Sequence, residues 1–274
     1  MDKSTFDTYI MLAILIPILV MSGIGQVMIL MEPSKSIEVD DDTIDAGADI
    51  TPPPSVTLEY ELIDNGTDTD KDGFTDSYER RDTILDPNKK DVVVYIVYTD
   101  DARLHQDDLT EIKHFYSESP IDNGNGLNVH FIENEYSMSN QVTYQTTARH
   151  FIREVSGTHK RSSHILYVTR SIDVSATSNV LGFAHNQYNY LAVETDNNDE
   201  RITLAHELGH SFGLTPSKNP AIDSHAASYN DYPSIMNYNY RYSGNNELVY
   251  ADNGYYDDWQ MIEDSFNNTE YLFG

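Results

Sequence analysis

The chain has 274 residues, and its 45 acidic and 17 basic residues give a formal net charge of −28. No basic stripe is present to neutralise nucleic-acid phosphates, and without cysteine the chain has no disulfide, no thiolate nucleophile and no thiolate zinc ligand. Because the acidic residues are spread along the chain, we predict a salt-adapted surface, as in proteins of extreme halophiles, where molar salt shortens the Debye length to roughly 3 Å.

The first element is an uncharged stretch between Thr8 and Met31. About twenty apolar residues suffice to cross a bilayer, and this stretch exceeds the roughly 7–15 residues of a signal-peptide core. We therefore predict a membrane anchor or uncleaved signal segment over residues 1–34, with a cleaved signal as the alternative. The anchor predicts a membrane partner and an extracellular catalytic domain at a cell surface or viral envelope; the cleaved signal predicts a secreted protein.

An acidic, proline-rich linker is predicted over residues 35–57, followed by a calcium-binding region over 58–90. Its core, "DTDKDGFTDSYE" (68–79), places oxygen ligands at loop positions 1, 3, 5, 7, 9 and 12 and a glycine at position 6. This spacing can surround one Ca²⁺, and it resembles an EF-hand or thrombospondin type 3 calcium loop. The predicted ligands are Asp68, Asp70, Asp72, the carbonyl of Phe74, Asp76 and Glu79.

From residue 91 onward, apolar strand patterns alternate with helical ones. Strands are predicted at 91–99, 126–133, 164–169, 180–185 and 190–194, and helices at 105–118, at 140–155 and from residue 199 or 200. This order predicts an α/β (α+β) fold, a mixed twisted sheet with packed helices, in one domain over 91–274.

The last of these helices carries two histidines and a glutamate with the spacing of a metal site. His206 and His210 are four residues apart, so both imidazoles project from one helix face and can bind one Zn²⁺. Glu207 lies beside the first histidine, within reach of a water molecule on the metal. Gly213 follows at a position where a left-handed residue can end the helix.

The stretch "HELGHSFG" (206–213), followed by "SIMNY" (234–238), resembles the metzincin zinc metalloproteases, here with a haloarchaeal-like acidic composition. The resemblance implies a metzincin-like fold with a zinc helix and a methionine turn. Met236 would then lie beneath the zinc ligands, and Tyr238 would contact the metal or the oxyanion. It also implies that "VLGFAH" (180–185) is an edge strand that pairs with extended substrate.

The chain departs from the family at the third ligand. The family has a histidine three residues after the glycine, where this chain has Pro216. His225, the only histidine after His210, is our first candidate for this ligand, and Asp223 is the alternative. A site without a third protein ligand is the remaining possibility.

With three ligands in place, a zinc-bound water has a pKa near 7, Glu207 acts as general base and Tyr238 stabilises the oxyanion. The sequence therefore predicts a membrane-anchored, zinc-dependent endopeptidase that acts on peptide or protein substrates and binds Zn²⁺ and Ca²⁺. The alternative is a catalytically inactive surface protein, binding or structural, that keeps the metzincin fold.

Overall fold

The computed structural model describes residues 66–99, 102–138, 142, 163–172, 180–185, 189–195, 200–244 and 246–267. The chain divides into two units, Met1–Thr51 and Pro52–Gly274, and all described residues belong to the second. The predicted anchor, the predicted linker and all but residue 142 of the predicted helix at 140–155 lie outside the described residues. Among the residues that are described, no helix has the length and apolar character to span a bilayer.

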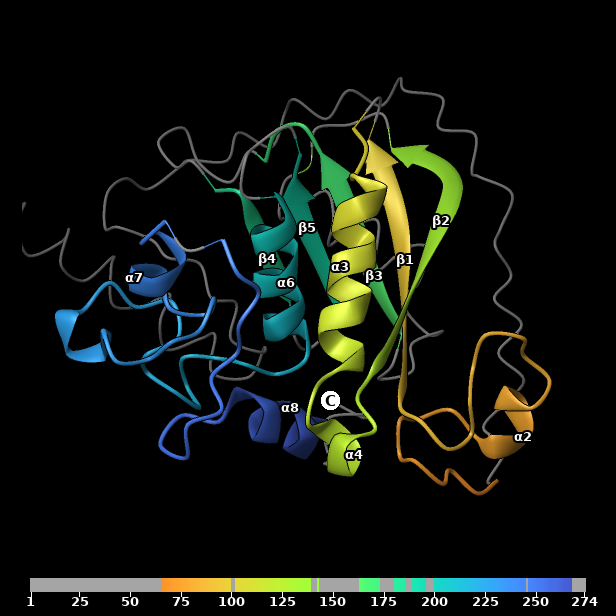
Figure 1. Ribbon diagram of the computed structural model, residues 1–274. Coiled ribbons are helices and arrows are strands. Elements are labelled where there is room, and N and C mark those ends of the chain that lie inside the picture. Colours follow the sequence, from red (N-terminus) through yellow and green to blue (C-terminus); the bar gives the residue numbers. More distant parts are fainter. Residues whose placement is uncertain are drawn as a thin grey trace, which may run out of the picture. The chain divides into compact units, whose positions relative to one another are not determined.

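A five-stranded mixed sheet is the centre of the fold (Figure 1). Its strands lie in the order β2-β1-β3-β5-β4, and all neighbours pair in parallel except β4, which is antiparallel to β5. The strands are β1 (Asp91–Thr99), β2 (Asn128–Met138), β3 (Ser163–Thr169), β4 (Gly182–His185) and β5 (Tyr190–Glu194). The predicted mixed α/β architecture is thus confirmed.

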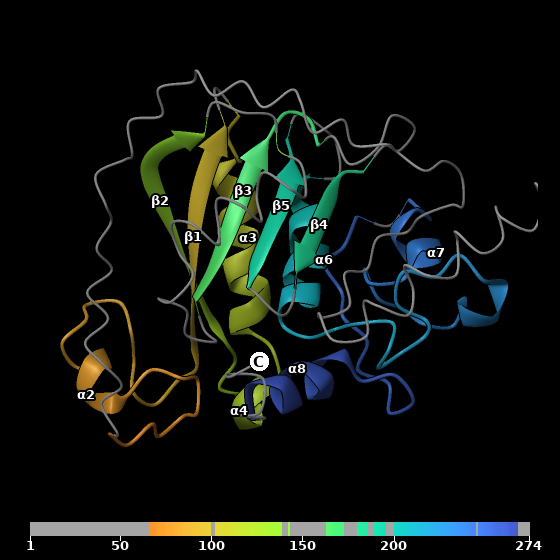
Figure 2. The same ribbon diagram turned by 180° about the vertical axis from the view of Figure 1, so that it is seen from behind.

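Two twelve-residue helices, α3 (Gln106–Ser117) and α6 (Glu200–Ser211), pack on one face of this sheet. They lie in front of the strands in Figure 1 and behind them in Figure 2. The other helices within the described residues are α2 (Asp76–Glu79), α4 (Ile121–Gly124), the 3₁₀ helix η1 (Ala227–Tyr229), α7 (Tyr238–Arg241) and α8 (Asp258–Asn267).

The central strands are buried on both faces, as their continuous apolar sequences predict. On the helix-covered face, alternate side chains such as Val94, Leu166 and Leu191 join the main core. Those between them, such as Ile165 and Ala192, form a second cluster on the opposite face. Tight packing on both sides gives α6 a rigid support.

The end of α6 is fixed by Gly213, which has a positive φ of 99°. The Leu214 amide donates to the Gly209 carbonyl at 2.9 Å, and the Gly213 amide donates to the His210 carbonyl at 2.9 Å. A side chain at residue 213 would also collide with Ser265 of α8. This glycine therefore lets the chain turn back beneath the last helical turn.

Candidate metal centre

His206 and His210 present their rings side by side, with 3.1 Å between the two Nε2 atoms. The Nδ1 atom of His206 lies 2.9 Å from the carbonyl oxygen of Ile235, and that of His210 lies 2.7 Å from the carbonyl oxygen of Leu214. Because a carbonyl only accepts, each Nδ1 carries a hydrogen, which leaves Nε2 of each ring as the nitrogen that can bind a metal. Such backbone partners are typical of metal-binding histidines.

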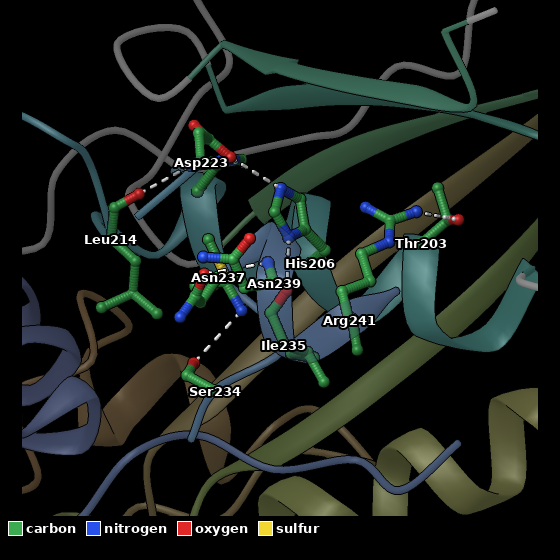
Figure 3. Close-up of polar contacts among 12 residues, drawn as sticks. Thr203, His206, Leu214, Asp223, Ser234, Ile235, Asn237, Asn239 and Arg241 are labelled. Carbon is green, nitrogen blue, oxygen red and sulfur yellow. Dashed lines mark hydrogen bonds and ion pairs between the residues drawn. The ribbon is translucent and has the colours of Figure 1, made fainter. Parts of the chain in front are cut away.

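Asp223 supplies the third donor atom. Its Oδ1 lies 3.1 Å from Nε2 of His206 and 3.3 Å from Nε2 of His210, and its carboxylate points toward the His206 ring (Figure 3). In a tetrahedral zinc site with bonds of about 2.0–2.1 Å, neighbouring ligand atoms are about 3.3 Å apart. The three donors therefore form a triangle of the size that a zinc ion requires, and their nitrogen and oxygen chemistry suits that ion.

Asp223 reaches this position from an irregular loop. Its φ of 55° lies in the left-handed region, which aspartate tolerates better than most residues. Its amide donates to the carbonyl of Met236 at 2.8 Å. The loop that carries the carboxylate is thus attached directly to the turn around Met236.

That turn, residues 234–238, packs against α6 next to the site. The side chain of Met236 is fully buried, and a Cβ at Gly209 of α6 would lie 2.7 Å from its sulfur. Asn237 donates to the carbonyl oxygens of Tyr229 and Tyr232 at 2.6 and 3.1 Å, which closes the turn. Since the Ile235 carbonyl orients His206, the turn sets the direction of one imidazole.

The charges within the triangle reinforce one another. Burial alone lowers the pKa of His210, but the Asp223 carboxylate outweighs it and raises that pKa to about 9. Burial acts upward on the pKa of Asp223, whereas His210 and His206 hold it well below its ordinary range. Asp223 therefore stays ionised at neutral pH, as a metal ligand must.

Glu207 lies buried between α6 and β4. A Cβ at Gly182 would be 2.7 Å from its Cγ and 2.8 Å from its Oε1, so only a glycine allows this approach. Burial raises the pKa of Glu207, while the charges of His206 and His210 act in the opposite direction. A carboxyl group with a raised pKa next to a possible metal site suits a general base.

Of the other predicted site residues, Tyr238 packs on a ring of the triangle, and His225 packs on Tyr238. The Tyr238 ring stacks on His206 at 5.7 Å, and burial and then Asp223 raise the pKa of its hydroxyl. His225 is exposed, and its ring packs on Tyr238 at 4.8 Å. Of the two candidates for the third ligand, the structure brings Asp223, rather than His225, to the histidine pair.

Arg241 is a residue of this region that the sequence did not indicate. Its side chain is buried at the end of α7, and Nη2 donates to the Thr203 hydroxyl at 2.6 Å (Figure 3). Thr203 lies one turn before Glu207 on α6, and the Arg241 charge lowers the pKa of that glutamate. An arginine three residues after Tyr238 looks in sequence like any surface residue, so only the fold brings it to the site.

The predicted calcium loop contains two groups of carboxylates. Oxygens of Asp68, Asp70 and Asp72 lie within 4.8 Å of one another, and so do oxygens of Asp72, Glu79 and Asp91. Among the predicted carboxylate ligands, Asp76 belongs to neither group. Asp91 lies outside the loop motif, and no spacing rule for such loops includes it.

Comparison with known proteins gives neighbours only at the level of structure. No family model matches the chain. No curated protein matches it either. An archaemetzincin from Methanopyrus kandleri superposes with a TM-score of 0.40 and 14% identity, over 65% of this chain and 96% of the neighbour. Metalloproteinase-II from Bacteroides fragilis gives 0.41 and 13%, over 64% and 52%. A zinc-dependent peptidase from Methanocorpusculum labreanum gives 0.32 and 15%, over 54% and 90%. Similarity this low says nothing about the activity of this chain.

Proposed function

We propose that this chain is a zinc-dependent peptidase of metzincin type, with His206, His210 and Asp223 as the zinc ligands. The observation that carries this proposal is the donor triangle, with sides of 3.1, 3.1 and 3.3 Å and both Nδ1 atoms committed to backbone carbonyls. Two histidines and a carboxylate also suit iron. The buried Glu207 beside them favours hydrolysis, because a redox site has no need of a general base there.

A bound zinc ion would supply a Lewis acid that lowers the pKa of water and polarises a peptide carbonyl. Glu207 takes the proton of the attacking water and passes it to the leaving amine. Tyr238, whose raised pKa keeps its hydroxyl protonated, stabilises the negative charge that develops on the carbonyl oxygen. Arg241 limits the rise in the pKa of Glu207, so that its carboxylate is available to accept a proton.

The substrate we propose is an extended peptide or protein segment that adds to β4. This strand ends the order of the described sheet, and no described strand pairs with its outer side. Gly182 of β4 packs on Glu207, so a peptide paired with this strand passes the proposed general base. Strand addition leaves the segment free to continue in both directions, which favours cleavage of internal bonds.

We also propose a calcium ion in the 68–79 loop and a membrane-anchored, extracellular enzyme. The calcium proposal rests on the clustered oxygens of Asp68, Asp70 and Asp72, and the anchor on the uncharged stretch between Thr8 and Met31.

The test is metal analysis together with peptide hydrolysis at about 1 M salt, where charge repulsion is screened. We expect one zinc per chain and hydrolysis of an unstructured protein such as casein. Glu207→Gln keeps the zinc but lowers kcat by about 100-fold or more, the contribution of a positioned general base.

Zinc binding without hydrolysis in the unmodified chain would favour the alternative, an inactive metzincin-fold surface protein. Iron in place of zinc would overturn the proposed chemistry. Equal activity of Glu207→Gln and the unmodified chain would remove Glu207 from the mechanism.

A further inference from the structure

A buried acidic cluster joins the 68–79 loop to the first strand of the sheet. Asp72, Glu79 and Asp91 are each fully buried, and they come from the loop, from α2 and from the first residue of β1. Each offers a carboxylate oxygen within 4.8 Å of the other two. Three buried carboxylates at this separation repel one another strongly unless positive charge lies between them.

Asp91 is held in place by contacts on both of its sides. Its amide donates to Oδ2 of Asp72 at 2.8 Å, which attaches the loop to the strand. Its Oδ1 lies 2.5 Å from Nε2 of His130 on β2, and its Oδ2 accepts from the amide of Asp86 at 2.6 Å. The carboxylate is thus oriented before any ligand binds, and each oxygen keeps a further lone pair.

Glu79 is the member of the cluster whose carboxylate most needs a partner. Both of its carboxylate oxygens are buried without a hydrogen-bond partner, and so is Oδ2 of Asp70. The nearby Lys90 directs its amine to the carbonyl oxygens of Asp70 and Lys71, not to Glu79. A buried carboxylate without any partner is a large desolvation penalty that a native fold rarely keeps.

The ionisation of these groups agrees with this picture. Burial, followed by the charge of Asp70, raises the pKa of Asp72 to about 9. Burial and the neighbouring carboxylates Asp70 and Asp91 raise the pKa of Glu79 to about 8. A divalent cation would stabilise the ionised forms and remove this penalty.

Asp76, the predicted ninth-position ligand, is committed elsewhere. Its Oδ1 accepts from the Thr69 amide at 2.9 Å. Its Oδ2 accepts from the Thr69 hydroxyl at 2.9 Å and from Arg80 at 3.0 Å. These contacts lower its pKa despite its burial, so Asp76 serves to brace the loop.

We propose that Asp72 and Glu79 of the loop bind a calcium-type cation together with Asp91 of β1, so that the peptidase sheet itself completes the site. This inference rests on the calcium loop proposed above. It replaces Asp76, one of the ligands predicted from the sequence, with Asp91. All-oxygen, carboxylate-rich donors in an irregular arrangement favour Ca²⁺ over Mg²⁺. Since the cation binds only when loop and strand are assembled, calcium stabilises the sheet domain and not the loop alone.

The experiment is calorimetric titration of CaCl₂ into the full-length chain after removal of bound calcium. Asp91→Asn and Glu79→Gln should each weaken calcium binding by about tenfold or more, because each removes a charged ligand. Asp76→Asn and His130→Gln are the matched controls, and both should stay within about threefold of the unmodified chain, since neither removes a ligand. His130→Gln separates the loss of the Asp91–His130 contact from the loss of the carboxylate itself.

A second measurement does not depend on the Asp91 variant folding. Calcium should slow amide hydrogen exchange along β1, Asp91–Thr99, in the unmodified chain and in Asp76→Asn. Slowing confined to residues 68–79, or an Asp91→Asn variant that binds normally, overturns this inference and leaves an ordinary calcium loop. No calcium binding at all overturns both calcium proposals. The peptidase proposal is tested separately, by the zinc content and by the activity of Glu207→Gln.

Discussion

At the scale of single residues, the candidate metal centre depends on how each donor atom is oriented. One ring nitrogen of each histidine, Nδ1, faces a backbone carbonyl. The carbonyl partner of His206 is Ile235, and that of His210 is Leu214. Asp223 adopts a left-handed backbone and is anchored through its amide. All three donors are thus fixed by main-chain contacts, which favours a preformed site over one that assembles around the ion.

This orientation predicts which residue completes the zinc site. Asp223→Asn should weaken zinc binding by more than the roughly 10- to 100-fold that loss of a ligand's hydrogen-bonding partner costs, because it removes a charged ligand. His225→Asn, which removes an exposed ring that packs on Tyr238 at a tilted angle, should bind zinc as tightly as the unmodified chain. The measurement is the zinc dissociation constant, obtained by competition with a chromogenic chelator.

Thermal unfolding of both variants in the absence of metal serves as the control for folding. If His225→Asn loses zinc while Asp223→Asn retains it, the ligand set proposed here is incorrect and the loop rearranges around the metal.

The sequence predicts the site residues on the helix but not the third zinc ligand, and the reason is physical. A helix fixes the relative positions of His206, Glu207 and His210, so their spacing alone indicates a common face. Residues 217–235 have no repeating pattern, and both Asp223 and His225 can reach the helix from such a loop. The structure distinguishes the two by the left-handed φ of Asp223 and by the hydrogen bond from its amide to Met236. Neither of these features can be predicted from the residue types.

At the scale of elements, α6 is held between β4 and the methionine turn by two glycines. Gly182 of β4 allows the strand to approach Glu207, and Gly209 of α6 allows Met236 to approach the helix. The two contacts lie against different functional groups, a proposed general base on one side and the support of a proposed zinc ligand on the other.

The two glycines should therefore give different defects when a methyl group is added. Gly182→Ala places a Cβ 2.7 Å from Cγ of Glu207, so we expect kcat to fall by about tenfold or more with zinc retained, because small displacements of a catalytic group are costly. Gly209→Ala places a Cβ 2.6 Å from the Tyr250 hydroxyl and 2.7 Å from the Met236 sulfur. We expect it to lower both zinc affinity and thermal stability.

Steady-state kinetics, metal analysis and thermal unfolding of the two variants distinguish these outcomes, and each variant is the control for the other. Loss of zinc in Gly182→Ala with full occupancy in Gly209→Ala would reverse the roles assigned to the two sides of α6.

Elements with strong local patterns are predictable, and the others are not. The strand predicted at 91–99 has the same bounds as β1, because nine residues rich in valine and isoleucine leave few other structures. The second strand is predicted to end at residue 133, but β2 continues to Met138 through the polar stretch "NEYSM". The short helices α4 and α7 have four residues each, too few for a periodic signal.

At the scale of the whole molecule, two populations of acidic residues differ in their relation to ions. Asp72, Glu79 and Asp91 are buried together at one site, whereas Asp107, Asp252 and others are exposed on separate elements. We propose a specific cation for the first population, whereas screening of the second requires only a high concentration of any salt. Composition predicts the second population but gives no hint of the first, which depends on the contact between loop and strand.

The exposed population leads to a prediction about salt. With a net charge of −28, repulsion between surface carboxylates destabilises the fold in dilute buffer. The Debye length falls from about 10 Å at 0.1 M to about 3 Å at 1 M, so we expect the thermal midpoint to rise steeply over this range of KCl and then to level off. Calcium and zinc are kept saturating, so that the change reports screening alone.

Sucrose at equal osmolality is the control, since it strengthens burial by exclusion from the surface without screening any charge. An equal rise in sucrose, or a midpoint that climbs at a constant slope beyond 1 M KCl, would show that hydration of the surface, rather than charge repulsion, limits the stability of the fold.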